Sequence, residues 1–133
     1  MQKYLYFRTV ADEDDDDASV DSGTFLLSRL TGMHPTATAA ITLFFEPQIP
    51  FLAAAETDHF ANADSVVLNI TEGTAFEVMR DLSLQFEGNP HQQPFLTVAD
   101  DMTTNLDNST RDAVYLVPNI TSCGAIVVTA ALA

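Results

Sequence analysis

The sequence SVVLNITEGTAFEVMRDLSLQFEG, residues 65–88, contains the clearest strand and the clearest helix of the chain, one directly after the other. In its first part apolar side chains recur at every second position, so that Val66, Leu68 and Ile70 fall on one face of an extended chain. A period of two residues is typical of a strand with a buried face. The pattern therefore predicts a strand over residues 65–71.

The second part of this sequence has the signals of a helix that begins and ends within it. Thr74 suits the N-cap, and Glu77 follows three residues later, which is the spacing of a capping box. Gly88 suits the C-cap, and Pro90 stops the helix. The apolar residues at helical spacing, expected to form the buried face, are Phe76, Val78, Met79, Leu82 and Phe86. We predict one helix over residues 75–87.

Further short apolar runs predict strands on both sides of this pair. Residues 3–10 place Leu5 and Phe7 on one face, and Tyr4, Tyr6 and Arg8 on the other. The other predicted strands are residues 24–30, which Gly32 and His34-Pro35 should end, then 39–46, 95–98, 113–117 and 125–129. Residues 51–62 fit a short helix or a packed loop, and residues 100–112 should form a long loop.

The order of these elements indicates the fold class. Strands precede and follow the one helix, and no internal repeat or linker-like break interrupts the chain. A chain of 133 residues can bury a core without disulfides or metals. We expect a single α+β domain over residues 1–133, mostly β, with an antiparallel-rich sheet and one packing helix.

The charge of the chain is strongly negative and narrows the choice of partners. Nineteen acidic residues stand against five basic ones, a formal net charge of −14, and the five basic residues are scattered. Phosphate binding needs clustered Lys and Arg, so we expect no nucleic acid partner and no anionic membrane surface. No apolar stretch approaches the length of a membrane span. The charge favours docking on a basic protein surface.

Six consecutive acidic residues, Asp12–Asp17, could bind a cation because clustered carboxylates bind calcium. An EF-hand loop that starts at Asp12 would need Gly at position 17 and Glu at position 23, where the chain has Asp17 and Gly23. Three interpretations stay open: a solvated loop, which we favour, a loose cation site, and an electrostatic docking tip. His34, His59 and His91 have no metal-ligand spacing, so we predict no metal and no cofactor.

The sequence has no recognisable catalytic motif. It lacks a GxSxG nucleophile elbow and a glycine-rich phosphate loop, and its one cysteine, Cys123, is most simply a buried packing residue. Asp100 and Asp101 are neighbours in a turn-like segment, where solvated side chains are the simpler interpretation than an acid and base pair. We therefore predict that the chain is not an enzyme.

Four features follow one another in residues 1–90: MQKYLYF at 1–7, the acidic run, LSRLTG at 27–32, and DSVVL at 64–68 ahead of the capped helix. In this order they resemble small virion structural proteins of marine tailed phages. The resemblance implies a capsid decoration or cement protein that is made in the host cytoplasm and lies on the capsid surface. It implies the major capsid protein or other virion proteins as partners, and a homo-oligomer such as a trimer. A tail or other virion-associated position is an alternative.

Candidate partner-binding residues lie in the first strand and the acidic run. Aromatic side chains concentrate binding energy at interfaces, which favours the outer face of the strand over residues 3–10 as an anchor. An equally simple interpretation is that these aromatics only cover the sheet. The candidates are Tyr4, Tyr6, Arg8, Asp12, Asp14, Asp15, Asp16 and Asp17.

Two other classes of function remain open at this point. One is a small acidic binding or inhibitory module that acts on a basic protein partner. The other is a small hydrolase or isomerase whose site is assembled by oligomerisation.

Overall fold

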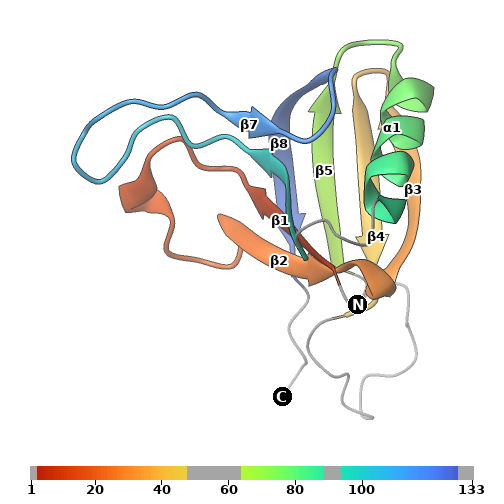
Figure 1. The fold of residues 1–133 in the computed structure, drawn as a ribbon, viewed down its shortest axis with the longest axis horizontal. Coiled ribbons are helices and arrows are strands. Elements are labelled where there is room, and N and C mark those ends of the chain that lie inside the picture. Colours follow the sequence, from red (N-terminus) through yellow and green to blue (C-terminus); the bar gives the residue numbers. More distant parts are fainter. Residues whose placement is uncertain (1–2, 48–63, 89–93, 129–133) are drawn as a thin grey trace.

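The computed structural model describes residues 3–47, 64–88 and 94–128. These residues form two four-stranded sheets and one α-helix, α1, which spans Ala75–Glu87 (Figure 1). Most neighbouring strands are antiparallel. The predicted class, α+β and mostly β, is therefore confirmed, although the strands divide between two sheets. The predictions for residues 51–62, His59 and His91 lie outside the described residues.

The first sheet has the strand order β2-β1-β6-β7. Its strands are β1 (Tyr4–Arg8), β2 (Ser22–Leu26), β6 (Phe95–Asp100) and β7 (Val114–Tyr115). β1 pairs antiparallel with β2 and parallel with β6. The parallel pairing brings the ends of β1 and β6, far apart in the sequence, to the same edge of the sheet.

The second sheet has the order β3-β4-β5-β8, with every neighbouring pair antiparallel. Its strands are β3 (Leu30–Ala37), β4 (Ala40–Phe45), β5 (Asp64–Ile70) and β8 (Ile120–Val127). The alternation predicted for the central strand is confirmed, because Val66, Leu68 and Ile70 are buried while the residues between them are half-buried.

The core lies where the two sheets and the helix meet. Phe7 of β1, Phe25 of β2 and Phe45 of β4 are buried, and their ring centroids lie 4.7 to 6.3 Å apart. Val78 and Leu82 of the helix join the same cluster. Aromatic rings at such spacings add to the free energy gained from burying apolar area.

The predicted strand over residues 24–30 is wrong in its second half. β2 ends at Leu26, a 3-10 turn follows over Leu27–Arg29, and β3 then runs through Gly32 and Pro35. Proline is tolerated there because β3 is an edge strand, where a missing backbone N–H leaves no partner unpaired. The expected stop signals therefore lie inside a strand.

The predicted bounds of the helix are confirmed, but two details are wrong. The Thr74 hydroxyl donates to the Thr71 carbonyl, at 2.6 Å, and makes no capping hydrogen bond. Phe76 is 67 % exposed, whereas Val78, Leu82 and Phe86 are buried. Two residues of α-helix rotate a side chain by about 200°, so Phe76 and Val78 project from opposite faces. The Lys3 ammonium donates to the Phe86 carbonyl, which satisfies one group at the end of the helix.

Candidate functional site

An arm extends from the edge of the first sheet, at the left of Figure 1. We define the acidic arm as residues 9–21 and 101–113, which follow β1 and β6. The amides of Thr103 and Thr104 donate to the Ala11 carbonyl, and the Glu13 amide donates to the Thr104 carbonyl, all at 2.9 to 3.0 Å. The Glu13 carboxylate also accepts from the Leu106 amide, at 3.0 Å. Backbone pairing thus joins the two halves of the arm.

The acidic arm carries most of the net charge of the chain. It holds ten acidic residues and one basic residue, a net charge of −9 out of −14. The acidic residues are Asp12, Glu13, Asp14, Asp15, Asp16, Asp17, Asp21, Asp101, Asp107 and Asp112, and the basic one is Arg111. Such a concentration creates a strong local negative potential that attracts positively charged surfaces.

A buried ion-pair cluster anchors the arm at its base. Asp100 is only 3 % exposed and forms two hydrogen bonds with the Arg8 guanidinium, both at 2.8 Å. Arg111 adds a third at 3.0 Å, and the Met102 amide donates to the same carboxylate. Arg8 also pairs with Asp16 at 3.2 Å. One arginine of β1 therefore connects the first half of the arm, through Asp16, with the end of β6, through Asp100, from which the second half continues.

The electrostatics of this cluster favour its charged form. Burial raises the pKa of Asp100, but the hydrogen bonds from Arg8 and Met102 and the charges of Arg8 and Arg111 outweigh burial, so the net pKa lies below its ordinary value. The pKa of Arg8 is raised, chiefly by its hydrogen bond to Asp100. A bidentate pair of an arginine and a carboxylate fixes the relative orientation of the two side chains as well as neutralising their charges.

A second polar cluster lies beside the first and involves the one cysteine. The Asp101 carboxylate accepts from the Tyr115 hydroxyl at 2.7 Å and from the Cys123 amide at 2.9 and 3.0 Å. The Thr9 hydroxyl donates to the Cys123 carbonyl. Burial, together with the charges of Asp101 and Asp100, raises the pKa of the Cys123 thiol to about 12. The thiolate is the nucleophilic form, so a raised pKa disfavours nucleophilic attack by the sulfur near neutral pH.

The structure divides the predicted acidic run into exposed and engaged residues. Asp14, Asp15 and Asp17 are exposed, as a solvated loop requires. Asp12 accepts from the Asp14 amide at the start of a 3-10 turn over Glu13–Asp15, and Asp16 is half-buried against Arg8 and Ser22. Within the described residues, no group of three His, Cys, Asp or Glu side chains is placed to hold a metal ion.

The predicted aromatic residues form part of an apolar patch on the outer face of the first sheet. We define the aromatic face as Tyr4, Tyr6, Leu26 and Phe95. Tyr4 is paired with Leu26 on one side and Phe95 on the other, and it is 41 % exposed. The Tyr6 ring lies 5.3 Å from that of Phe95, with the Arg8 guanidinium 5.5 Å from its centre.

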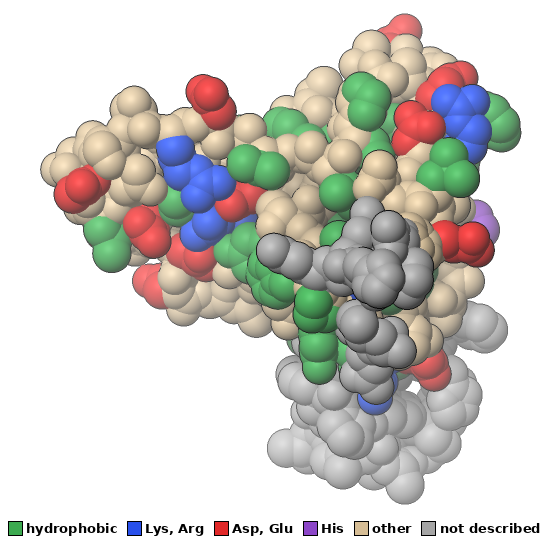
Figure 2. Space-filling view, in the orientation of Figure 1, with side chains coloured by type: hydrophobic (Ala, Val, Ile, Leu, Met, Phe, Trp, Pro, Cys, Tyr) green, Lys and Arg blue, Asp and Glu red, His purple; other side chains and the backbone are tan. Residues whose placement is uncertain are grey.

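The aromatic face and the acidic arm are continuous. Hydrophobic side chains gather over β1 and β2 in Figure 2, next to the acid-rich arm at the left. The end of this face that is farther from the arm, where β1 begins, has a small hollow. It is lined by Tyr4, Thr24, Leu26 and Arg29. Tyr6 is partly covered by its neighbours, so Tyr4 and Phe95 are the more accessible anchors.

Several residues of the site were not anticipated from the sequence. Asp100 is buried in an ion-pair cluster, so its interpretation as a solvated turn residue is wrong. Arg111 and Phe95 were not among the candidates. A signal was available for Asp100, because a carboxylate at the end of an apolar strand needs a cationic partner if the strand is buried. Its partner lies 92 residues earlier in the chain and is not visible in local patterns.

Comparisons with known proteins found no match, whether with family models, with curated proteins or with solved structures. In the described part of the chain, no helix is long and apolar enough to cross a membrane. His34 is exposed and lies near the Phe44 ring, with centroids 5.8 Å apart.

Proposed function

We propose that this chain is a non-enzymatic virion structural protein, a capsid decoration or cement protein that stabilises the lattice of the major capsid protein. It attaches through the acidic arm and the adjoining aromatic face. The observation that carries the proposal is the placement of −9 of the −14 net charge on one arm that a buried cluster around Asp100 holds in place.

The negative charge of the arm opposes folding. Like charges this close repel one another, which disfavours the folded arm. Arg8 and Arg111 offset part of this repulsion. Arg8 bonds to Asp16 of the first half, Arg111 belongs to the second half, and both bond to Asp100 at the end of β6, so the two halves are held to the sheet. A prearranged acidic surface loses less conformational entropy when it binds a basic partner. Binding to a basic protein surface is therefore the role that fits the arm best.

The aromatic face supplies what the arm lacks. Charge complementarity speeds encounter and selects partners, whereas large aromatic side chains at the centre of an interface contribute most of the affinity. Tyr4 and Phe95 are 41 % and 47 % exposed, at the end of the aromatic face that is farther from the arm. Together the two surfaces suit a partner with an apolar pocket or ridge beside a basic patch.

The class of partner comes from the resemblance of residues 1–90 to small virion structural proteins. A cement protein needs many weak, repeated contacts and no cofactor, and a compact acidic β domain meets those demands. The expected partner is the major capsid protein, or another virion protein if the chain belongs to the tail.

Capsids of the parent virus, assembled without this chain, provide the test. Adding the purified protein should raise the temperature at which the capsids disassemble, measured by light scattering during a thermal ramp. A variant that carries Tyr4→Ala and Phe95→Ala should need a higher concentration for the same effect. Capsids that neither bind the protein at moderate salt nor gain thermal stability would count against the proposal.

A second candidate is a small acidic module that inhibits a basic partner, and the charge density of the arm favours it. Carboxylates spaced along an arm can occupy the same basic groove as the phosphates of a nucleic acid. The two functions differ in their dependence on the arm. Replacing Asp14, Asp15 and Asp17 by Asn should abolish inhibition of a nucleic-acid-binding partner, but it should only weaken capsid binding.

A further inference from the structure

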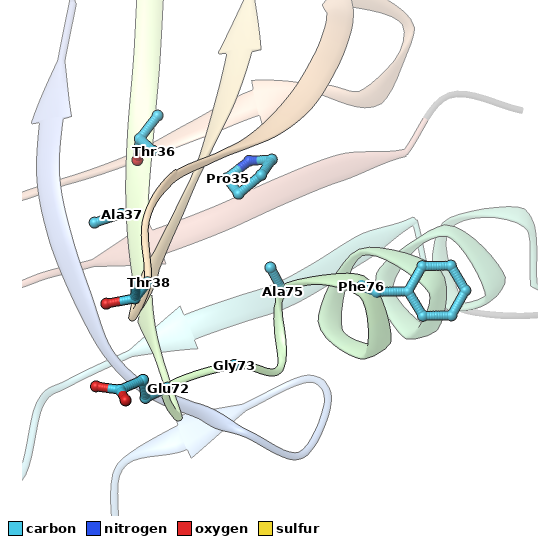
Figure 3. Close-up of a pocket in the computed structure, with 8 residues that line it drawn as sticks. All are labelled: Pro35, Thr36, Ala37, Thr38, Glu72, Gly73, Ala75 and Phe76. Atoms are coloured by element: carbon cyan, nitrogen blue, oxygen red, sulfur yellow. The ribbon is translucent and has the colours of Figure 1, made fainter.

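An apolar hollow lies at the other end of the molecule, between the turn from β3 to β4 and the beginning of α1 (Figure 3). Its volume is about 640 Å³. Figure 3 shows Pro35 and Ala75 across the gap from one another, with Glu72 at one side. The lining residues are Pro35, Thr36, Ala37, Thr38, Glu72, Gly73, Ala75 and Phe76. Most of these side chains are small, which leaves room for an inserted group.

A large apolar knob stands directly beside this hollow. Phe76 is 67 % exposed, and its ring points away from the hollow in Figure 3. The Arg80 guanidinium lies 5.6 Å from the centre of the ring. Leu84, which lies one turn after Arg80 and two turns after Phe76 in the helix, is 64 % exposed. Phe and Arg are both enriched at protein interfaces relative to the rest of the surface.

We propose that this face binds the same face of a second copy around a two-fold axis. An interface of this kind must be self-complementary, because the same patch serves both copies. A knob adjoining a hollow meets that requirement: Phe76 of one copy enters the hollow of the other, and the reverse contact forms at the same time.

The charges on the face support a second copy as the occupant. Because Arg80 lies against the Phe76 ring, insertion of Phe76 brings Arg80 to the rim of the partner's hollow. Glu72 is the acidic residue that lines this hollow. A two-fold axis therefore creates two contacts between Arg80 and Glu72. Arg80 also pairs with Asp81 of its own helix at 3.2 Å, so in the dimer each Arg80 lies between that carboxylate and Glu72 of the second copy.

The position of the face also reduces the repulsion between two acidic copies. The helix lies at the opposite side of the molecule from the acidic arm (Figure 1). Pairing through the helix places the two arms at the far ends of the dimer, where salt screens charges that are separated by more than about 8 Å. The arms and the aromatic faces stay free for other partners. This inference does not depend on the proposed function.

Sedimentation equilibrium of the full chain, at about 0.15 M salt and over a range of concentrations, tests the pairing. The wild type should show a reversible monomer–dimer equilibrium. Phe76→Ala should raise the dissociation constant about tenfold or more, as expected for a central aromatic anchor. Leu106→Ala serves as the matched control, because Leu106 is 63 % exposed but lies on the acidic arm; it should leave the equilibrium unchanged.

A charge exchange identifies the contact itself. Arg80→Glu and Glu72→Arg should each weaken the dimer, because each places like charges opposite one another. An equimolar mixture of the two variants should form a heterodimer with an affinity near that of the wild type, since both contacts are then attractive. A wild type that stays monomeric throughout, an equal effect of Leu106→Ala and Phe76→Ala, or a mixture without recovery would overturn the proposal.

Discussion

Asp100 is the residue on which the position of the acidic arm depends most. It is buried, and it accepts hydrogen bonds from two arginines and one backbone amide. Removing one partner of a buried ion pair leaves the other charge without compensation. The cluster should therefore contribute to stability mainly through the cost of breaking it.

The substitution Asp100→Asn tests this role. It keeps the shape of the side chain but removes its charge, and we expect the free energy of unfolding to fall by about 2–4 kcal/mol. Urea denaturation at neutral pH measures the change. Asp81→Asn is the control, because Asp81 pairs with the exposed Arg80 at 3.2 Å and should cost no more than about 0.5 kcal/mol. Equal effects of the two substitutions would contradict the assignment.

The difference in stability between the wild type and Asp100→Asn should depend on pH in a direction that the pKa of Asp100 sets. The pKa of Asp100 in the folded protein is below its ordinary value of 3.8. Its contribution is therefore complete above about pH 4 and is lost as the pH falls through the folded-state pKa. The wild type and Asp100→Asn should converge in stability as the pH is lowered from neutral. A constant difference across this range would show that the carboxylate charge is not the cause.

At the scale of elements, the pairing of β5 with β8 depends on a close backbone approach. Val66 is opposite Ile126 and Leu68 is opposite Cys123, so Gly124 and Ala125 together face Val67. This is a β-bulge, in which two residues face one. A Cβ atom on Gly124 would lie 3.0 Å from Val67 Cβ and 3.1 Å from its carbonyl oxygen. Only glycine fits this position without displacement of β5.

We expect Gly124→Ala to lower the free energy of unfolding by about 1–3 kcal/mol, as overpacking of a strand interface does. Gly23→Ala in β2 is the matched control, because its nearest atom, Phe25 Cε2, is 3.8 Å from the added Cβ. Urea denaturation of both variants measures the difference. If Gly124→Ala were as stable as the control, the close approach of β5 and β8 would be wrong.

The elements whose signals are local were predictable from the sequence. Alternation over β5 and the bounds of α1 are examples, because a period of two or of 3.6 residues is set within one segment. β3 was missed because its proline reads as a stop, and only its place at the edge of a sheet makes proline acceptable. Division into two sheets was also not predictable, because it depends on pairing between distant strands.

The candidate site was predictable to a smaller extent. The acidic run predicts an exposed loop, and Asp14, Asp15 and Asp17 are exposed. The anchoring of that loop was not predictable, because it requires the parallel pairing of β1 with β6, which brings Arg8 beside Asp100. Tertiary contacts of this kind leave no periodic signal in either strand.

At the scale of the whole molecule, charge and apolar surface are distributed unevenly. The acidic arm holds −9 of the net charge, and the aromatic face adjoins it. The hollow beside Phe76 lies on the opposite side, next to α1. The two proposals together assign a basic partner to one end of the molecule and a second copy to the other, an arrangement that suits a repeated lattice.

We propose that the acidic arm provides the attraction to a basic capsid surface. The affinity for capsids at a series of salt concentrations, measured with three proteins, tests this attraction. These are the wild type, an arm variant and a control variant with the same charge change elsewhere. The arm variant carries Asp14→Asn, Asp15→Asn and Asp17→Asn, and the control carries Glu46→Gln, Glu77→Gln and Glu87→Gln.

The affinity of the wild type should fall as salt rises, because screening weakens attraction between opposite charges. At low salt the arm variant should bind about tenfold more weakly than the wild type, with a shallower dependence on salt, since each lost charge pair contributes part of the attraction. The control should behave like the wild type. Equal binding by the arm variant and the control at every salt concentration would contradict the claim.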